Sequence, residues 1–291
     1  MVTIKHYTNK YDVNEGVFYD TSFFNEIITE NTDGYITLNG KSKILFKFRK
    51  KVINDDICNI ATKTFLSHSK TVNVNRGFAA GLMPDGNVFK FRNNTKQTNK
   101  SYSSISGYFD KAHQHIRKYF NTRNVCRTTI FTKRNKDKFD NSLIFFKTID
   151  SLYKELAPIE YNNQLNYTKK IMKDMIINDT VFTTVTSNYN WRTACHRDKG
   201  DFENGLGNLA ITGDDNWSGC CLGFPEYKVA IDITKGDFLL MDVHEKHCNT
   251  ELIHKNKKKG IRLSFVCYVR KDMILCNTKK IINNEIYYYQ K

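Results

Sequence analysis

The sequence has no long apolar run, no internal repeat and no low-complexity linker. Its 291 residues contain no window near the roughly 18 apolar residues that a membrane-spanning helix needs. The first residues also lack the apolar core of a signal peptide. These absences predict an intracellular chain without membrane contact, and they do not distinguish nucleus from cytoplasm.

Cysteine is present, but without the spacing of a metal site or a disulfide framework. None of the eight cysteines forms a C-x-x-C pair, and Cys220 and Cys221 are adjacent. A secreted chain of this size would more often carry a paired framework. The pattern predicts a reducing compartment, no structural zinc site, and thiols that serve mainly as core residues.

Acidic residues are in the minority. The chain has 45 Lys and Arg against 30 Asp and Glu, a net charge of +15. Such an excess favours a polyanionic partner through counterion release from phosphates. The chain is also rich in Asn, Ile and Tyr, so codon bias in an AT-rich gene explains part of the Lys excess. We therefore interpret the basic clusters at 41–51, 133–138 and 255–259 first as solvated surface.

The pattern of apolar residues changes near residue 178. Before it, helical spacing marks residues 108–120, 141–156 and 165–176, and Pro158 follows the second of these. After it come short strand-like runs separated by turn residues: 182–187, 209–212, 220–224, 227–233, 238–243 and 262–269. Many short strands of this kind predict an antiparallel sandwich or barrel.

A His-x-Asp pair, His196 and Asp198, lies just after the first of these strand-like runs. Side chains two apart on a strand point the same way. Two imidazoles and one carboxylate on one face of a metal are diagnostic of non-haem Fe(II) oxygenases. The second imidazole must then come from elsewhere in the barrel.

Three later histidines compete to be that ligand. We prefer His247, which follows the strand-like run 238–243. His244 is the rival and His254 a weaker candidate. In the preferred arrangement, His244 or Asp242 would support the ligands or be purely structural.

Arg262 and Ser264 form an Arg-x-Ser pair on the last strand-like run. An iron site of this kind usually takes its electrons from a 2-oxoacid, whose distal carboxylate suits the bidentate fork of Arg. Each residue alone is more often ordinary than functional. Together, however, His-x-Asp, Gly-Asp (Gly236 and Asp237), His and Arg-x-Ser occur in order within one β-rich stretch. Chance is a poor explanation of this ordered set, so we interpret its members as functional.

With these residues in this order, the chain resembles the TET/JBP dioxygenases, and most closely their J-binding-protein and phage branch. The family oxidises the 5-methyl group of thymine or 5-methylcytosine in nucleic acid. The resemblance spans roughly residues 75–276. It rests on residues 190–201 (NWRTACHRDKGD), 205–208 (GLGN), 236–247 (GDFLLMDVHEKH) and 262–268 (RLSFVCY), with 75–81 (NRGFAAG), 106–110 (SGYFD) and 126–128 (CRT) upstream.

The resemblance implies an α+β fold with a double-stranded β-helix, or jelly-roll, catalytic core. We expect a single catalytic domain over 1–291, with an N-terminal α+β support region (1–177), the core (178–276) and a C-terminal extension (277–291).

The resemblance also assigns the site. Fe(II) would be bound by His196, Asp198 and His247, and 2-oxoglutarate by Arg262 with help from Ser264. Where the family often has Gly after the distal His, this chain has Cys248, which would make the site sensitive to oxidation.

The expected reaction converts thymine in DNA to 5-hydroxymethyluracil with O2 as co-substrate. The base must be flipped out of a duplex or lie in a single strand, and Asn188, Asn190 and Arg192 are candidates to read it. The same chemistry on 5-methylcytosine, RNA or a free nucleotide stays open, as does ascorbate as reductant. A catalytically silent jelly roll that binds modified DNA is the alternative from another class, and the intact triad disfavours it.

Overall fold

Strands dominate the computed structural model, which describes residues 1–38, 40–73, 76–85, 88–91, 101–255 and 259–291. The chain divides into two units, and each is described by itself. Unit 1 comprises Met1–Ser104, Ser187–Asp198 and Leu209–Phe265. Unit 2 comprises Ile105–Thr186, Lys199–Asn208 and Val266–Lys291. Each unit therefore combines segments that are far apart in the sequence.

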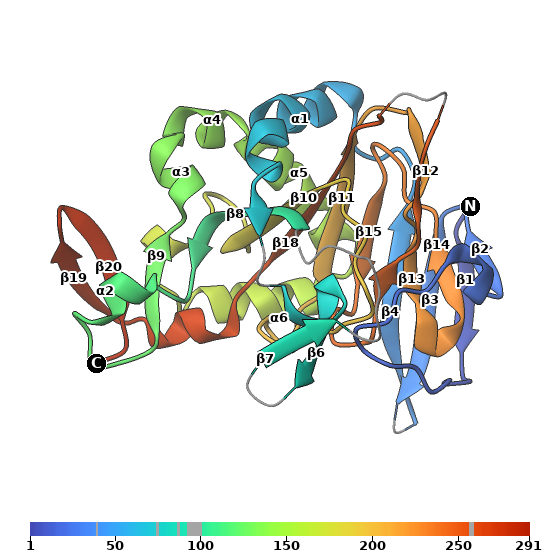
Figure 1. Ribbon diagram of the computed structural model, residues 1–291, viewed down its shortest axis with the longest axis horizontal. Coiled ribbons are helices and arrows are strands. Elements are labelled where there is room, and N and C mark those ends of the chain that lie inside the picture. The colour runs from blue at the N-terminus through green and yellow to red at the C-terminus, as the bar shows by residue number, and fades with distance from the viewer. Residues whose placement is uncertain (39, 74–75, 86–87, 92–100, 256–258) are drawn as a thin grey trace. The chain divides into compact units, whose positions relative to one another are not determined.

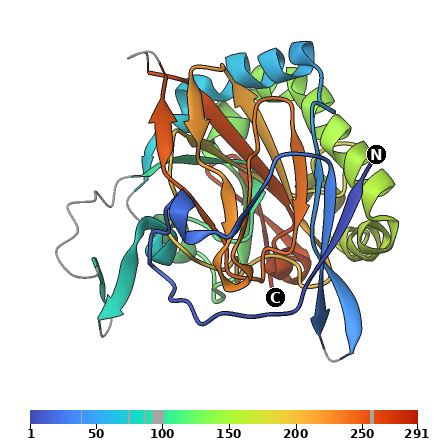
Figure 2. The same ribbon diagram turned by 90° about the vertical axis from the view of Figure 1, so that its right-hand side faces the viewer.

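Unit 1 is mainly β-structure (Figure 2). Its strands are β1 (Thr3–Tyr7), β2 (Glu26–Ile28), β3 (Thr32–Leu38), β4 (Lys41–Arg49), β5 (Val72–Asn73), β6 (Leu82–Asp85), β7 (Val88–Phe91), β12 (Trp217–Gly219), β13 (Leu222–Phe224), β14 (Val229–Ile231), β15 (Phe238–Met241), β16 (Cys248–Asn249) and β17 (Leu252–His254). Its helical segments are η1 (Thr21–Phe23), α1 (Asp55–Ser69), η2 (Gly77–Ala80) and η4 (Pro225–Tyr227). The unit boundaries fall within β8 (Ser101–Phe109), β10 (Thr184–Tyr189), β11 (Gly207–Gly213) and β18 (Arg262–Tyr268).

Two sheets form the core of unit 1. One runs in the order β1-β3-β4-β15-β11-β18-β10, and the other in the order β16-β13-β14-β2. The ring of Phe46 on β4 stacks on that of Phe224 on β13, with centroids 6.0 Å apart, and both side chains are fully buried. The strands predicted within residues 209–269 are all present, and the two packed sheets agree with the predicted sandwich. The sheets are not wholly antiparallel as predicted, because β1 pairs with β3 and β14 pairs with β2 in parallel.

Helix α1 supports the strands of unit 1 that carry functional candidates. The helix begins after Asn54, whose side chain accepts a hydrogen bond from the backbone N–H of Ile57. Its buried Phe65 packs edge-on against Phe265 of β18, with ring centroids 5.4 Å apart. This contact packs α1 against the middle of β18.

Unit 2 contains most of the helices (Figure 1). Its helical elements are α2 (Gln114–Arg117), α3 (Ile130–Arg134), α4 (Lys136–Asn141), α5 (Leu143–Leu156), α6 (Pro158–Thr168), η3 (Lys173–Met175) and η5 (Lys271–Leu275). Its further strands are β9 (Val125–Thr128), β19 (Thr278–Ile282) and β20 (Glu285–Tyr289), and β20 pairs with both of the others. The helix predicted over 141–156 is confirmed as α5, which begins at Leu143 and ends at Leu156. Pro158 follows it as the first residue of α6, where a missing N–H costs nothing.

Two helix predictions in unit 2 were wrong in extent. Residues 108–109 belong to β8, and the helix predicted over 108–120 is reduced to the four residues of α2. Gly107 has a positive φ of 79°, and a Cβ there would lie 2.6 Å from the carbonyl oxygen of Thr183. The apolar residues after Gly107 have helical spacing, but the first of them are held in β8 by this close strand contact, so a helix cannot begin there. The helix predicted over 165–176 ends instead at Thr168, and only the short η3 follows.

A disulfide in unit 2 joins Cys126 of β9 to Cys276, 150 residues later. Both cysteines are buried, and Met175, Met273 and Tyr288 pack with them. The other six cysteines are free and buried, in agreement with their predicted role as core residues. The disulfide was not predicted, because the sequence around two distant cysteines does not show which of the eight cysteines will pair.

We expect this disulfide to contribute about 2–5 kcal/mol to the stability of unit 2, because it closes a long loop in the unfolded chain. Reduction should lower the urea midpoint of unfolding of the wild type. The double variant Cys126→Ala, Cys276→Ala should unfold at that lower midpoint whether or not reductant is present. Thiol titration in denaturant should count six thiols before reduction and eight after it. Eight thiols in the unreduced protein would contradict the assignment.

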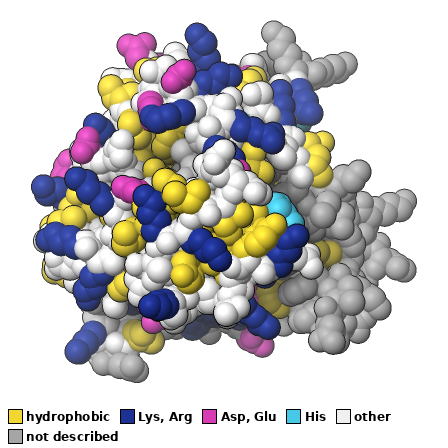
Figure 3. All heavy atoms as spheres, turned by 90° about the vertical axis from the view of Figure 1, so that its left-hand side faces the viewer, with side chains coloured by type: hydrophobic (Ala, Val, Ile, Leu, Met, Phe, Trp, Pro, Cys, Tyr) yellow, Lys and Arg dark blue, Asp and Glu magenta, His cyan; other side chains and the backbone are white. Residues whose placement is uncertain are grey.

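Basic side chains are spread over the face of the molecule drawn in Figure 3, on the side where the β19–β20 hairpin lies in Figure 1. Exposed residues of this kind in unit 2 lie near α2 and on β19: Lys111, Arg117, Lys118, Arg123, Lys279 and Lys280. Such a surface suits a polyanion. Among the described residues, no helix is long and apolar enough to cross a membrane.

Candidate metal and co-substrate site

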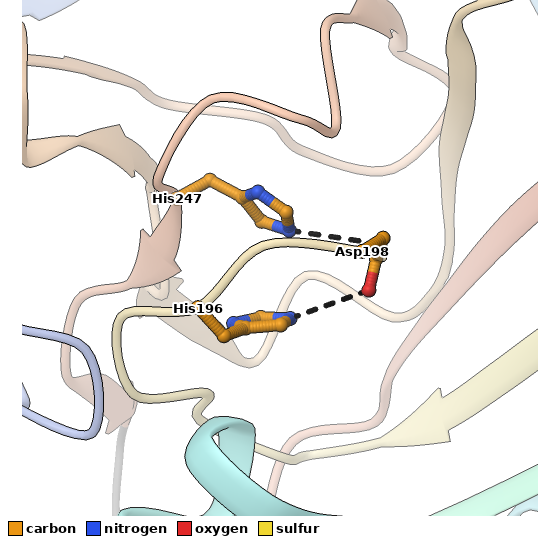
Figure 4. Close-up of side chains that lie close together, drawn as sticks. All are labelled: His196, Asp198 and His247. Carbon is orange, nitrogen blue, oxygen red and sulfur yellow. Dashed lines mark ion pairs between the residues drawn. The ribbon is translucent and has the colours of Figure 1, made fainter. Parts of the chain in front are cut away.

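The structure brings His196, Asp198 and His247 together in unit 1 (Figure 4). One potential ligand atom from each lies within 4.8 Å of the others. Nε2 of His196 is 3.8 Å from Oδ1 of Asp198, and Nε2 of His247 is 3.8 Å from Oδ2. Two imidazole nitrogens and a carboxylate that converge in this way can hold a divalent transition metal and leave its remaining positions open.

Backbone hydrogen bonds place these side chains. The N–H of His196 donates to the carbonyl of His247 over 2.9 Å, and the N–H of His247 donates back over 3.0 Å. This isolated antiparallel bridge fixes the two imidazole-bearing segments against each other. The N–H of Asp198 donates to the carbonyl of Val243 over 3.0 Å and continues the attachment. The ligands therefore come from two chain segments, 49 residues apart, that are locked by main-chain contacts.

Both imidazole rings are held by their Nδ1 atoms. Nδ1 of His196 lies 2.8 Å from the carbonyl oxygen of Ala194, and Nδ1 of His247 lies 3.0 Å from that of Glu245. A carbonyl can only accept, so each Nδ1 carries the proton and each Nε2 presents a lone pair. Such second contacts fix the tautomer and the ring orientation of metal-bound histidines. The donor set thus fits a metal ion.

The electrostatics favour neutral imidazole at the first ligand. Burial lowers the pKa of His196 to about 4, and the nearby His247 acts in the same direction. The carboxylate of Asp198 opposes this shift without reversing it. The ring is therefore neutral near pH 7, which is the form that binds metals.

The competing histidines lie elsewhere. The backbone N–H of His244 donates to the carboxylate of Asp242, whose other oxygen pairs with Lys43 over 2.6 Å. His254 is exposed on β17, and its Nδ1 accepts a hydrogen bond from the N–H of Gly260. Within the described residues, His247 alone among these three joins His196 and Asp198 in a potential metal-binding group.

Arg262 on β18 is buried, with 1% of its surface exposed. Its guanidinium lies 5.3 Å from the centroid of the Trp217 ring, and Nη2 donates to the carbonyl of Cys220 over 3.4 Å. The Nε of Arg262 has no hydrogen-bond partner. The guanidinium as a whole forms no ion pair within the described part of the chain. A buried guanidinium without a carboxylate is costly, so this position suits an anionic ligand.

Further unpaired polar atoms accompany Arg262. Ser264, two residues on along the same strand, accepts a hydrogen bond from Nδ2 of Asn188 over 3.2 Å. The Oδ1 of Asn188 and the Nε1 of Trp217 are buried without a partner. Because native structures rarely leave such atoms unsatisfied, this group fits a polar ligand better than an empty core. Trp217 was not identified from the sequence, where a single Trp carries no signal.

The other two base-reading candidates already make contacts. Oδ1 of Asn190 accepts from the N–H of Arg262 over 2.7 Å, and its Nδ2 donates to the carbonyl of Gly260 over 2.6 Å. Arg192 pairs with Asp20 over 2.6 Å and stacks over the ring of Phe18. A role for any of the three in base recognition stays a prediction, and Asn188 alone among them has an unpaired buried atom.

Cys248, directly after His247, is fully buried. It packs in a cluster of buried residues that includes Cys195 and Cys221. Burial raises the pKa of the Cys248 thiol, so the reactive thiolate is disfavoured there. This environment reduces the sensitivity to oxidation that was predicted for this position.

Comparison with known families gives one match that spans more than half of the chain. Residues 104–271 match the Tet_JBP model, described as the oxygenase domain of the 2OGFeDO superfamily. That superfamily implies Fe(II) and 2-oxoglutarate, and the donor set of the triad fits this metal.

Similar curated proteins include the bifunctional helicase and thymine dioxygenase JBP2 of Leishmania braziliensis. It is 40% identical over 149 residues, which are 51% of this chain and 13% of that protein. The thymine dioxygenase JBP1 of Trypanosoma brucei brucei is 32% identical over 169 residues, 58% of this chain and 19% of that protein. The chain thus spans less than a fifth of the length of these relatives.

A solved structure of NgTET1 in complex with 5mC DNA has the same fold. The superposition has a TM-score of 0.55 at 12% sequence identity and covers 94% of this chain and 83% of that one. The predicted α+β class with a jelly-roll core is therefore confirmed.

Proposed function

Because this chain belongs to the Tet_JBP family of oxygenase domains in the 2OGFeDO superfamily, we propose that it hydroxylates the 5-methyl group of thymine in DNA. The product is 5-hydroxymethyluracil. The observation that carries the proposal is the convergence of His196, Asp198 and His247, with both Nδ1 atoms tied to carbonyls. The relatives named thymine dioxygenases support thymine as the substrate.

In this proposal His196 and His247 bind Fe(II) through Nε2 and Asp198 binds it through a carboxylate oxygen. Iron bound with 2-oxoglutarate and O2 supplies the oxidising power that replaces a methyl hydrogen by hydroxyl. The carbonyls of Ala194 and Glu245 keep the two rings in the correct tautomer. The low exposure of the imidazoles, 15% and 6%, limits access of bulk water.

Arg262 holds the distal carboxylate of 2-oxoglutarate. Its fork can donate two parallel hydrogen bonds, which orients a carboxylate as well as binding it. Ser264 adds a hydroxyl, and Asn188 holds that hydroxyl in place through its Nδ2 atom. Trp217, which lies against the guanidinium, excludes water from the same site. Together the four residues would bind and orient this one carboxylate.

DNA is the proposed polymeric substrate, with the target base flipped out or single-stranded. The complex of NgTET1 with 5mC DNA and the basic residues of unit 2 support nucleic acid as the partner. Thymine and 5-methylcytosine differ at position 4, an acceptor in one and a donor in the other. An amide side chain carries both a donor and an acceptor and can satisfy either, so 5-methylcytosine is the second candidate substrate.

The test of substrate class is a panel assayed under identical conditions. It contains a thymine oligonucleotide, a 5-methylcytosine oligonucleotide, a ribo-oligonucleotide with 5-methyluridine, and free thymidine monophosphate. We expect the oxidised nucleoside chiefly from the thymine oligonucleotide. Equal turnover of the free nucleotide would overturn DNA as the substrate. Parallel reactions without 2-oxoglutarate, with and without ascorbate, identify the reductant.

The alternative is a catalytically inactive jelly roll that only binds modified DNA. The complete triad disfavours it, and so does the buried guanidinium of Arg262, which has no carboxylate partner in the described structure. The same panel separates the two readings. Retention of oligonucleotides without any oxidised product, while a known dioxygenase of this superfamily works in the same buffer, would support binding alone.

A further inference from the structure

The ligand-bearing segments of unit 1 have a second face. In the antiparallel bridge, His196 lies opposite His247. Successive side chains of an extended segment alternate between its two faces, so Arg197 and Lys246, the neighbours of these two histidines, are expected on the face away from the imidazoles. Both cations reach the same carboxylate, that of Glu226, so they lie close to each other. Like charges at short range repel each other.

One buried carboxylate meets both cations. Glu226 of η4 is 4% exposed. Its Oε2 lies 3.2 Å from Nη2 of Arg197, and its Oε1 lies 3.3 Å from Nζ of Lys246. Nη2 of Arg197 also donates to Oε1 over 3.4 Å, so Arg197 contacts both carboxylate oxygens and Lys246 contacts one of them. Lys10 is a more distant third cation, 3.6 Å from Oε2 and half exposed.

The cations are also anchored to backbone. Nη1 of Arg197 donates to the carbonyl of His244, and Nζ of Lys246 donates to that of Val13 over 2.8 Å. A second carboxylate, Glu15, is 3.9 Å from Nε of Arg197, which is beyond hydrogen-bond distance. Glu226 contacts both segments and thereby joins them.

We propose that Glu226 is a positioning residue for the metal site. It bridges Arg197, which stands between two of the ligands, to Lys246, which precedes the third. By neutralising both cations it holds the two segments at the separation that the imidazoles need. This inference rests on the proposed metal site, although Glu226 itself contacts neither metal nor substrate.

The test is the affinity of the whole chain for Co(II), measured by isothermal titration calorimetry and by the visible absorption of the bound ion. We expect Glu226→Gln, which keeps the side-chain volume and removes the charge, to weaken Co(II) binding by about 10-fold or more. Loss of groups that hold metal ligands typically costs about 10–100-fold. The absorption spectrum should change as well, because the ligands are less well fixed.

Asp33 provides the matched control. It is a buried carboxylate on β3, 8% exposed, and it pairs with Arg49 over 2.7 Å and with Lys47 over 3.5 Å. Asp33→Asn removes a comparable bridge away from the metal ligands. It should lower the melting temperature as Glu226→Gln does, yet leave the Co(II) affinity within about twofold of wild type, since no ligand-bearing segment is touched.

A further variant tests the role of charge. In Glu226→Gln the two cations repel each other, and in the double variant Glu226→Gln, Lys246→Gln they do not. The double variant should therefore bind Co(II) more tightly than Glu226→Gln alone. If Glu226→Gln does not fold, Lys246→Gln alone should still weaken binding several-fold, because one of the two segments is released.

The outcomes separate this inference from the proposed function. A wild type that binds no Co(II) would contradict the metal site itself. A wild type that binds Co(II), with Glu226→Gln and Lys246→Gln of unchanged affinity and spectrum, would overturn the role of Glu226 and leave the metal site intact.

Discussion

Asp198→Ala is expected to abolish thymine oxidation and to weaken Co(II) binding by more than about 100-fold. Asp198 contributes the charged member of the triad, with its two oxygens 3.8 Å from the Nε2 atoms of His196 and His247. Without it, only the two imidazoles remain, and the loss of affinity should exceed the effect of about 10–100-fold that follows from disturbing the support of a ligand. Calorimetric titration with Co(II) and a succinate assay measure the two effects.

The control for Asp198→Ala is His254→Ala, which removes an exposed imidazole on β17. Metal affinity and turnover should both match the wild type, because His254 lies outside the potential metal-binding group. Turnover of Asp198→Ala near the wild-type rate would remove Asp198 from the metal site.

Arg262→Met should raise the KM for 2-oxoglutarate by about 30-fold or more, while the ligand-free protein stays at least as stable as the wild type. Loss of one partner of a buried, hydrogen-bonded charge pair costs about 2 kcal/mol or more, which corresponds to that factor. The buried guanidinium has no carboxylate of its own in the described structure. Its removal therefore relieves a desolvation cost in the ligand-free state.

Thermal unfolding with and without 2-oxoglutarate measures the stability of the ligand-free protein and the binding of the co-substrate. The wild type should be stabilised by 2-oxoglutarate, since a ligand that binds only the folded state raises its stability, and Arg262→Met should not be. Arg49→Met is the matched control, because Arg49 is bonded to Asp33. It should lose stability and keep its KM. A KM for Arg262→Met within threefold of wild type would exclude Arg262 as the carboxylate anchor.

The site was largely predictable from the sequence because its chemistry needs particular residue types in order along the chain. His-x-Asp is a local pattern, and Arg262 with Ser264 follows from the period of a strand. The choice of His247 over His244 could not be made from spacing alone. In the described part of the structure, His247 joins His196 and Asp198 in a potential metal-binding group, and main-chain bonds pair it with His196.

What could not be predicted depends on contacts between distant segments. Cys126 and Cys276 are 150 residues apart, and nothing local marks them as partners. Glu226 lies on the short helical turn η4, from which its carboxylate contacts Arg197 and Lys246. In the sequence, the residues of this turn cannot be told apart from those of an ordinary surface loop.

Residues 108–120 show a different limit. Their apolar spacing fits a helix, yet Tyr108 donates its N–H to the carbonyl of Thr183 over 2.8 Å. Strand pairing prevails there because tertiary contacts override a local preference.

The most direct measurement is quantitative mass spectrometry of a reaction that contains the protein, Fe(II), 2-oxoglutarate, O2 and a single-stranded DNA with one thymine. We expect 5-hydroxymethyluracil in the digested DNA and succinate in an equal molar amount, with both products absent from the His196→Ala reaction. Unchanged thymine with no succinate, alongside a working control dioxygenase, would contradict it.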